Sequence, residues 1–308
     1  MTSLVEVSSH LPSTVGVSDL VGELRLTNAQ VRRFTRLYGL DRICRAPERS
    51  ETDLLLAAVG GLSGRDSDRD RITHVIRVRG VRTAAPYPID PLRQVRDVLG
   101  LRRARTLTVT DHGCAGGLIA LDVAAALLDD AGDPDALALV LTGEKAFTPF
   151  ASMLPDVTIT GEGVAAVLLG EGPRDRVLSH ASRVHGRADG TIALTGAVAA
   201  QSYRIYQDAL GEVVHRALSD AGLGLSDVDI VLPHNANQVS WTVAADRLGI
   251  PKNKIFLHNV GRTGHCFAAD PFINHRSAGV LGLLHPGDHV LMVAAGLGQT
   301  LAATVLRH

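Results

Sequence analysis

Short apolar runs alternate with stretches of helical periodicity along this chain, and this alternation restricts the fold more than any other feature. In the first half, four apolar runs have the length of buried strands, and helical stretches lie between them. Repeated strand–helix–strand units of this kind form sheets that helices cover. The apolar runs are 72–78, 106–110, 136–142 and 163–169, and the helical stretches are 91–99 and 117–128. The sequence therefore predicts an α/β fold.

The second half repeats this order after a polar break at 170–176. We expect helices at 202–221, 237–248 and 271–284, and strands at 230–232, 254–257, 289–294 and 300–306. Each half then holds a strand, a long helix, another strand and a closing antiparallel pair. The chain is therefore expected to form two equivalent halves, residues 1–172 and 173–308.

Composition excludes several classes of protein. The 308 residues are 45% hydrophobic and 4% aromatic, and the net charge of −1 gives no reason to expect nucleic acid or an anionic membrane as a partner. Three widely spaced cysteines do not resemble the disulfide framework of a secreted domain. No secretory signal and no apolar run long enough to span a bilayer is present. These features favour a soluble protein of the reducing cytoplasm.

Cys114 lies where a predicted strand gives way to a predicted helix, in the sequence Asp-His-Gly-Cys-Ala-Gly-Gly at 111–117. A helix N-terminus leaves backbone N–H groups unpaired and carries roughly half a positive charge, and both favour a thiolate over a thiol. A thiol at this place is a good nucleophile. A free cysteine is more often a small apolar residue of the core, so catalysis by Cys114 requires partners elsewhere in the chain.

Two histidines occupy similar turns in the second half. His234 follows the predicted strand 230–232 through a proline, and His265 lies in the glycine-containing segment 261–271. Active sites of α/β sheets collect at such strand ends. A lone histidine there is more often structural, but one cysteine and two histidines on equivalent turns can converge into a catalytic group.

A glycine turn at 295–300 separates the last two predicted strands. Glycines let backbone N–H groups approach a ligand closely, so this turn and the N–H of Cys114 can form an oxyanion hole. A plain hairpin is the alternative. The sequence contains no phosphate-binding loop, no nucleophile elbow, no paired-cysteine motif and no zinc-ligand spacing. We therefore expect neither a dinucleotide nor a metal ion.

Taken together, these segments resemble the ketoacyl synthase III branch of the thiolase superfamily over nearly the whole chain. Residues 111–117 resemble its nucleophilic-cysteine turn, 161–169 its Gly-Asp-Gly-Ala-Gly-Ala strand, and 232–237 its Val-Pro-His-Gln-Ala-Asn motif. Segments 251–259 and 295–307 match as well. Each motif is short, and their combination makes the signal strong.

The resemblance implies a thiolase fold, a five-layered αβαβα arrangement of two pseudo-equivalent halves that usually forms a homodimer. It also implies that an acyl group passes from coenzyme A or an acyl carrier protein to the cysteine, with no tightly bound cofactor. By motif position, Cys114 is the nucleophile, and His234 is its base and hydrogen-bonding partner. The N–H groups of Cys114, Leu297 and Gly298 form the oxyanion hole.

The third catalytic residue departs from the family pattern. Where ketoacyl synthase III has Gly-Asn-Thr-Ser, this chain has Gly-His-Cys-Phe at 264–267, which resembles the Thr-Gly-His segment of the elongating synthases I and II. Asp270 lies about one helical turn further on, and ketosynthase-III-like acyltransferases of antibiotic pathways resemble this pattern with a Cys-His-Asp set. The sequence leaves both His265 and Asp270 open as the residue that completes the set.

These two sets suit different chemistry. Decarboxylative condensation uses neutral donors that stabilise an enolate, whereas a nearby carboxylate repels the developing anion. Asp270 is better suited to orient His234 as a general base that deprotonates a hydroxyl or an amine. Asp270 therefore favours ester or amide formation.

The entrance segment 27–40 lacks the adenine-stacking tryptophan of the family, and Arg33 is the nearest replacement. Arginine stacks on bases and grips phosphates, so Arg33 and Arg36, with Asn237 of the histidine motif, are expected to hold the donor. The donor is either coenzyme A or the phosphopantetheine of a carrier protein. A solvated helix face is the alternative for the two arginines.

We interpret the chain as an acyltransferase of specialised metabolism, in polyketide or antibiotic biosynthesis. It would pass an acyl group from a thioester through Cys114 to a hydroxyl or amine of a small-molecule acceptor. One alternative is a condensing enzyme that forms carbon–carbon bonds with His234 and His265. The other is a non-catalytic homologue that supports an active partner subunit, and the presence of Cys114 and His234 argues against it.

Overall fold

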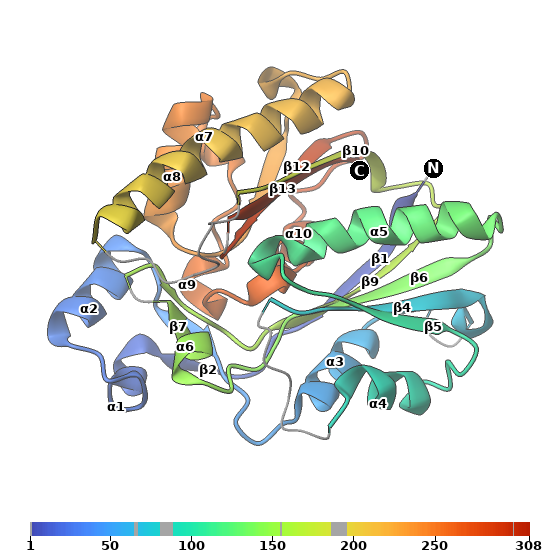
Figure 1. The fold of residues 1–308 in the computed structure, drawn as a ribbon, viewed down its shortest axis with the longest axis horizontal. Coiled ribbons are helices and arrows are strands. Elements are labelled where there is room, and N and C mark those ends of the chain that lie inside the picture. Colours follow the sequence, from blue (N-terminus) through green and yellow to red (C-terminus); the bar gives the residue numbers. More distant parts are fainter. Residues whose placement is uncertain (1, 65–66, 81–88, 155, 186–195, 298) are drawn as a thin grey trace.

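The computed structural model describes residues 2–64, 67–80, 89–154, 156–185, 196–297 and 299–308. Its helices and strands stack in five alternating layers (Figure 1). Two helices cover the outer face of one sheet, two lie between the sheets, and two cover the outer face of the other sheet. In this order the helices are α7 (Gly196–Asp220) and α8 (Gln238–Leu248), α5 (Gly116–Ala131) and α10 (Asp270–Val280), and α3 (Glu51–Val59) and α4 (Pro91–Val98).

In the described part of the chain, nine strands follow one another in the order β11-β12-β13-β10-β1-β9-β6-β4-β5. A single residue pair, Ser3 with Arg176, joins β1 to β10, so the strands divide into two sheets at this point. One sheet contains β1 (Ser3–His10), β4 (Ile72–Val78), β5 (Arg105–Val109), β6 (Leu137–Thr142) and β9 (Val164–Gly170). The other contains β10 (Arg176–Val184), β11 (Ile230–Pro233), β12 (His289–Gly296) and β13 (Thr300–Arg307).

Short elements cap these layers. The strand pairs are β2 (Thr14–Gly16) with β3 (Arg42–Cys44) and β7 (Met153–Leu154) with β8 (Thr158–Ile159). The short helices are α1 (Val21–Leu24), α2 (Asn28–Arg32), a π-helical turn (Arg33–Leu37), α6 (Pro149–Ser152) and α9 (Val260–Thr263). The 3₁₀ turns are Val17–Leu20, Arg69–Arg71, Gly113–Ala115, Leu225–Asp227, Lys252–Lys254 and Phe267–Ala269.

The two central helices approach each other closely at their N-terminal ends. A Cβ atom added to Gly117 of α5 would lie 2.4 Å from the carbonyl oxygen of Ala268 and 2.9 Å from the ring of Phe272. Leu118 and Phe272 are fully buried in the core that both sheets share. Burial of each such side chain contributes about 1.5–3 kcal/mol. This packing holds the turn that carries Cys114 against the segment that leads into α10.

Most of the predicted elements are confirmed, and so is the expected α/β layering. In the first half, each predicted strand is present within one residue at either end, and the helices are α4 and α5. In the second half, α7, α8 and α10 correspond to the predicted helices, and β11, β12 and β13 to predicted strands. Helix α10 ends at Val280, before the predicted residue 284, because Gly282 adopts a positive φ of 68° in the turn that follows.

One predicted strand is wrong, and two strands of the large sheets, as well as the four short strands β2, β3, β7 and β8, were not predicted. The expected strand 254–257 is replaced by the 3₁₀ turn Lys252–Lys254, and Ile255 forms only an isolated bridge with Val231. The sequence Pro-Lys-Asn-Lys at 251–254 favours a turn over a buried strand at this place. Strands β1 and β10 were missed because serine, histidine and charged residues interrupt their apolar pattern.

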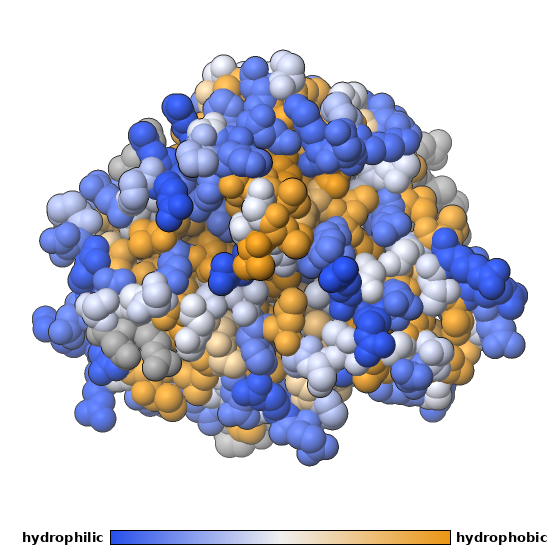
Figure 2. Space-filling view, turned by 180° about the vertical axis from the view of Figure 1, so that it is seen from behind, coloured by the Kyte–Doolittle hydropathy of each residue, from blue (hydrophilic) through white to orange (hydrophobic). Residues whose placement is uncertain are grey.

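The strands of the first sheet all precede residue 171, and those of the second all follow residue 175. The division at residues 172 and 173 remains a prediction. Among the described residues, no helix combines the length and the apolar character that crossing a bilayer requires. Figure 2 shows the face opposite to that of Figure 1, where polar and charged side chains cover most of the surface and apolar side chains emerge in separate patches.

Candidate active site

Cys114 lies in a tight turn between β5 and α5. Asp111 and Gly113 in this turn have positive φ angles of 70° and 52°. A 3₁₀ turn, Gly113–Ala115, then leads directly into the helix, and the Cys114 side chain is buried. The unpaired N–H groups of a helix start give the sulfur a positive electrostatic environment.

His265 lies between α9 and α10, and backbone contacts fix it on both sides. Its N–H donates to the carbonyl of Ile159 at 3.0 Å, and its carbonyl accepts from the N–H of Gly161 at 2.8 Å. Gly264 precedes it with a φ of 70°, where a Cβ atom would lie 2.9 Å from the side chain of Ile43. The ring therefore enters the site from a rigid support.

Cys114, His265 and Asp270 form a continuous chain of contacts. The Sγ of Cys114 lies 2.9 Å from Nε2 of His265, and Nδ1 of His265 lies 2.5 Å from Oδ2 of Asp270. All three side chains are buried. A carboxylate on one ring nitrogen and a nucleophile on the other is the arrangement of a catalytic triad.

Asp270 is the first residue of α10 and is completely buried. Besides the imidazole, its carboxylate accepts from the N–H groups of Asn235 at 2.6 Å and Cys266 at 2.8 Å, and from the Asn235 side-chain amide at 3.2 Å. Four donors therefore hold the carboxylate in one orientation and compensate its burial.

His234 lies next to this chain of contacts. Its ring packs edge-on against Trp241 and His265, with centroid distances of 5.3 and 5.8 Å. Its Nδ1 is buried without a hydrogen-bond partner. The contact with Cys114 that we expected for His234 is made by His265. The expectation that Asp270 orients His234 is wrong, because the carboxylate binds the His265 ring.

The two imidazoles have opposite electrostatic environments. Burial alone would lower the pKa of His265, but the negative charges and hydrogen bonds of Cys114 and Asp270 outweigh it and raise that pKa well above its usual value. Burial, together with the charge of His265, lowers the pKa of His234 to about 3. At neutral pH the site therefore holds one imidazolium, His265, and one neutral imidazole, His234.

The turn after β12 touches the turn of Cys114. A Cβ atom at Gly296 would lie 2.1 Å from the carbonyl oxygen of His112 and 2.9 Å from the backbone N of Cys114. Leu297, one of the predicted oxyanion-hole residues, lies beside Gly113. A Cβ atom added to Gly113 would lie 2.9 Å from the backbone N of Leu297. Gly298 lies outside the described residues.

Comparisons with known proteins show which proteins this chain resembles. Residues 218–308 match the protein family described as 3-oxoacyl-(acyl-carrier-protein) synthase III C terminal. The chain is 31% identical to the beta-ketoacyl-(acyl-carrier-protein) synthase III of Erythrobacter litoralis over 215 residues, 63% of this chain and 65% of that protein. It is 27% identical to the Synechocystis protein of the same name over 238 residues, 70% of this chain and 71% of that protein.

The structural comparison covers the rest of the chain. A solved structure named ChlB3 and described as an acyltransferase matches with a TM-score of 0.87 and 25% identity, covering 99% of this chain and 97% of that one. In sequence and in fold the chain is similar to the ketoacyl synthase III-like family. The five layers seen here are the thiolase fold of that family, which is a family of enzymes.

Two of the expected donor-binding residues, Arg33 and Asn237, contact the same turn, and the third, Arg36, is exposed. Arg33 forms an ion pair with Asp156, and Asn237 donates from its side chain to the carbonyl of Val157 at 3.0 Å, so both contact the same turn. Asn237 also caps α8 by accepting from the N–H of Ser240. Arg36 is exposed on the π-helical turn.

Two asparagines and one histidine of the site were not singled out from the sequence. Asn274 donates to the carbonyl of Pro233 at 2.7 Å and to the side chain of Asn235 at 2.8 Å, which supports the Asp270 carboxylate from behind. Its position four residues after Asp270 places both on one face of α10, and this spacing is the available signal. His112, two residues before Cys114, has a buried Nδ1 without a partner.

The neutral state of His234 predicts an acid-sensitive fold. Its pKa is about 3 in the folded protein and 6.5 in the unfolded chain, so the unfolded chain binds more protons between these values and stability falls as pH drops through this window. As the pH drops through this window, the unfolding free energy of His234→Gln should therefore fall less steeply than that of the wild type, by up to about 1.4 kcal/mol per pH unit. Urea unfolding between pH 6.5 and 3 measures this slope.

The matched control for this prediction is His285→Gln. The His285 side chain is 71% exposed, so its replacement is expected to leave the slope unchanged. A His234→Gln slope equal to that of the wild type would show that His234 does not stay neutral in the folded protein.

Gly296→Ala should disturb the Cys114 turn directly. The added methyl group would collide with the carbonyl of His112, so the two turns must separate. A displacement of about 1 Å at a reacting group costs about 100-fold in rate, and we expect acylation of Cys114 to slow by this factor. Gly279→Ala in α10 is the control, since its Cβ meets nothing closer than 4.0 Å. Acylation of the Gly296→Ala variant at the wild-type rate would contradict the contact.

Proposed function

We propose that this chain is an acyltransferase that moves an acyl group from a thioester donor to a hydroxyl or amine of a small-molecule acceptor. The observation that carries the proposal is the buried chain from the Cys114 sulfur through the His265 ring to the Asp270 carboxylate. The acyltransferase description of ChlB3, whose fold matches over nearly the full length, supports it. Specialised metabolism is the context that we infer.

In the first step the Cys114 sulfur attacks the carbonyl carbon of the thioester. The carbon–sulfur bond to the donor then breaks, and the departing thiolate takes the proton from Nε2 of His265. In this proposal neutral His234 donates a hydrogen bond to the oxyanion, together with backbone N–H groups of the Cys114 turn and Leu297. This step leaves an acyl thioester on Cys114 and a neutral His265.

In the second step the acceptor attacks the acyl carbon, and its proton passes to Nε2 of His265. The bond from the acyl carbon to Cys114 Sγ breaks, which restores the thiolate and the imidazolium. Asp270 holds Nδ1 of His265 protonated, so Nε2 faces the acceptor in its basic form. Each proton that enters the cycle has a defined acceptor.

Carbon–carbon condensation makes less use of this arrangement. Decarboxylation of a malonyl group forms its carbanion without removal of a proton, so a base oriented by a carboxylate has no role in that step. The neutral His234 and the names of the curated relatives favour condensation as the second candidate. Both reactions would begin with the same acyl-enzyme.

The donor is either coenzyme A or the phosphopantetheine arm of an acyl carrier protein, and no tightly bound cofactor is required. Arg33 pairs with the turn that Asn237 contacts, and Arg36 is exposed on the same π-helical turn as Arg33; phosphate groups suit such guanidinium groups. A homodimer is also part of the proposal, because β5 is the edge strand of the described sheet and offers its free backbone groups to a second copy.

The experiment that tests the function supplies radiolabelled acetyl and malonyl thioesters with a nucleophile-bearing acceptor. Acyl transfer is supported by labelled ester or amide without release of carbon dioxide. Carbon dioxide release from the malonyl thioester, coupled to a carbon–carbon product, would establish condensation in its place. A wild-type protein that takes up no label from any thioester would overturn both and favour a supporting subunit.

A further inference from the structure

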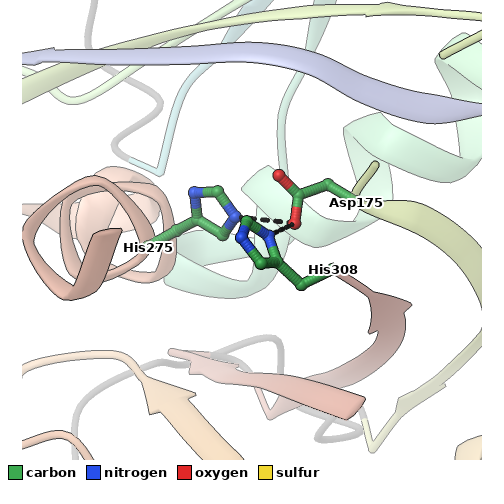
Figure 3. A group of neighbouring side chains, drawn as sticks. All are labelled: Asp175, His275 and His308. Carbon is green, nitrogen blue, oxygen red and sulfur yellow. Dashed lines mark hydrogen bonds and ion pairs between the residues drawn. The ribbon is translucent and has the colours of Figure 1, made fainter. Parts of the chain in front are cut away.

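Three side chains with metal-binding donor atoms meet outside the Cys114 site. Nδ1 of His308 lies 2.7 Å from Oδ1 of Asp175, and Nε2 of His275 lies 3.1 Å from the same oxygen (Figure 3). All three donor atoms lie within 4.8 Å of one another. His275 is only 7% exposed. Its Nε2 lacks a partner with hydrogen-bond geometry.

The fold brings these residues together from three separate places. Asp175 precedes β10 and His308 follows β13, and the first pair of these antiparallel strands joins Arg176 with Arg307. His275 lies on α10 of the central layer. We expected no metal site from the sequence, because residues so far apart along the chain form no recognisable ligand spacing.

Backbone contacts fix two of the three residues. The carbonyl of Asp175 accepts from the N–H of Leu4 at 3.0 Å, and its φ of 52° is unusual for a residue with a side chain. The N–H of His308 donates to the carbonyl of Asp288 at 2.9 Å, and its own carbonyl accepts from Gly287. The donor atoms are therefore held in place by the fold around them.

We propose that Asp175, His275 and His308 bind a divalent transition-metal ion, with zinc the best fit. Two imidazole nitrogens and one carboxylate oxygen form a donor set that zinc prefers, and calcium or magnesium would require more oxygen atoms. Bond lengths of about 2.0–2.2 Å place tetrahedral ligands roughly 3.4 Å apart. The donor atoms reach this spacing by small side-chain rotations.

An open coordination position remains beside the three residues. They line a cavity of about 400 Å³, which offers room for a further ligand. The cavity is also lined by Arg174 and Arg276, which are exposed, so an anion such as chloride or hydroxide suits this position better than a neutral molecule. Glu6 lines the cavity as well, but its carboxylate accepts from the N–H groups of Ser63 and Gly64.

A metal ion at this place would connect the second sheet to the central layer. It would tie the adjoining ends of β10 and β13 to α10, the helix that begins with Asp270. Because the ion binds the folded chain and not the separated ligands, bound zinc should raise the melting temperature of the protein. The proposal does not depend on the acyl-transfer chemistry.

The test is zinc binding to the chelator-treated chain, measured by calorimetry and by metal content after dialysis. We expect one zinc per chain, and at least about 100-fold weaker binding after His275→Gln, His308→Gln or Asp175→Asn, since loss even of a supporting residue costs up to this much. His285→Gln, which removes an exposed imidazole beside Asp288, is the matched control and should bind as the wild type does.

Cobalt substitution separates this site from zinc bound at Cys114. The proposed site contains no sulfur, so the cobalt protein should show a tetrahedral spectrum without a thiolate charge-transfer band, and Cys114→Ala should bind equally well. This measurement on the unaltered chain stands even if a ligand variant fails to fold. A thiolate band that disappears with Cys114, no stoichiometric binding, or binding that survives all three ligand substitutions would overturn the proposal.

Discussion

Cys114→Ala should abolish acylation of the protein and reduce acyl transfer by at least about 10⁴-fold, the size of loss that follows removal of a catalytic nucleophile. The remaining groups, His265, His234 and the backbone donors, can still polarise a bound thioester, but no sulfur is left to accept the acyl group. Intact-protein mass spectrometry after incubation with an acyl thioester measures the first effect. Product formation under saturating donor and acceptor measures the second.

The control for this prediction is Cys266→Ala, which removes a thiol close to the same site. Hydrogen bonding with Cys44, burial and nearby negative charge raise the pKa of Cys266 well above its usual value, so this thiol remains protonated and unreactive. We expect the acyl adduct to form on this variant as on the wild type. An adduct that persists in Cys114→Ala would remove Cys114 from its proposed role.

Asp270→Asn should slow acyl transfer about 10³–10⁴-fold and self-acylation about 10-fold. An amide cannot hold Nδ1 of His265 protonated as a carboxylate does, so the ring loses the form in which Nε2 accepts a proton from the acceptor. Acylation depends less on this form, because the helix start beside Cys114 also stabilises negative charge on the sulfur. Single-turnover measurement of each step separates the two rates.

The pH dependence distinguishes this positioning role from a purely structural one. The charge of Asp270 contributes to the raised pKa of His265, so its removal lowers that pKa. The acidic limb of the pH profile for transfer should therefore move to lower pH in Asp270→Asn. Because Asp270 also accepts from Asn235 and Cys266, the variant will be less stable, and melting curves must show that it is folded. Equal slowing of both steps with an unmoved profile would exclude the proposed role.

The sequence predicts the layered fold well because its buried strands are continuous apolar runs. Strands β6 and β9 lie in the middle of a covered sheet, and all of their residues are buried. Strand β1 is equally central, but Glu6, Ser8 and His10 interrupt its pattern. Periodicity detects elements whose side chains all face apolar neighbours, and it misses strands that carry polar groups into the sheet.

The sequence also identifies the residues of the candidate site but not their pairing. Cys114, His234, His265 and Asp270 were all expected on turns near the site, and the structure brings them together. Which imidazole meets the sulfur depends on ångström differences among three loops. The Ile159 and Gly161 contacts place the His265 backbone, and motif spacing contains no information about such long-range hydrogen bonds.

The position of β1 in the middle of the sheet has a consequence for synthesis on the ribosome. Of the strands in its sheet this segment is made first, yet its partner β9 (Val164–Gly170) is made more than 150 residues later. At translation rates of about 5–20 residues per second, β1 waits roughly 10–30 s without its neighbour. During that interval the nascent chain exposes an unpaired strand, so chaperone binding to residues 3–10 would protect it from misassembly.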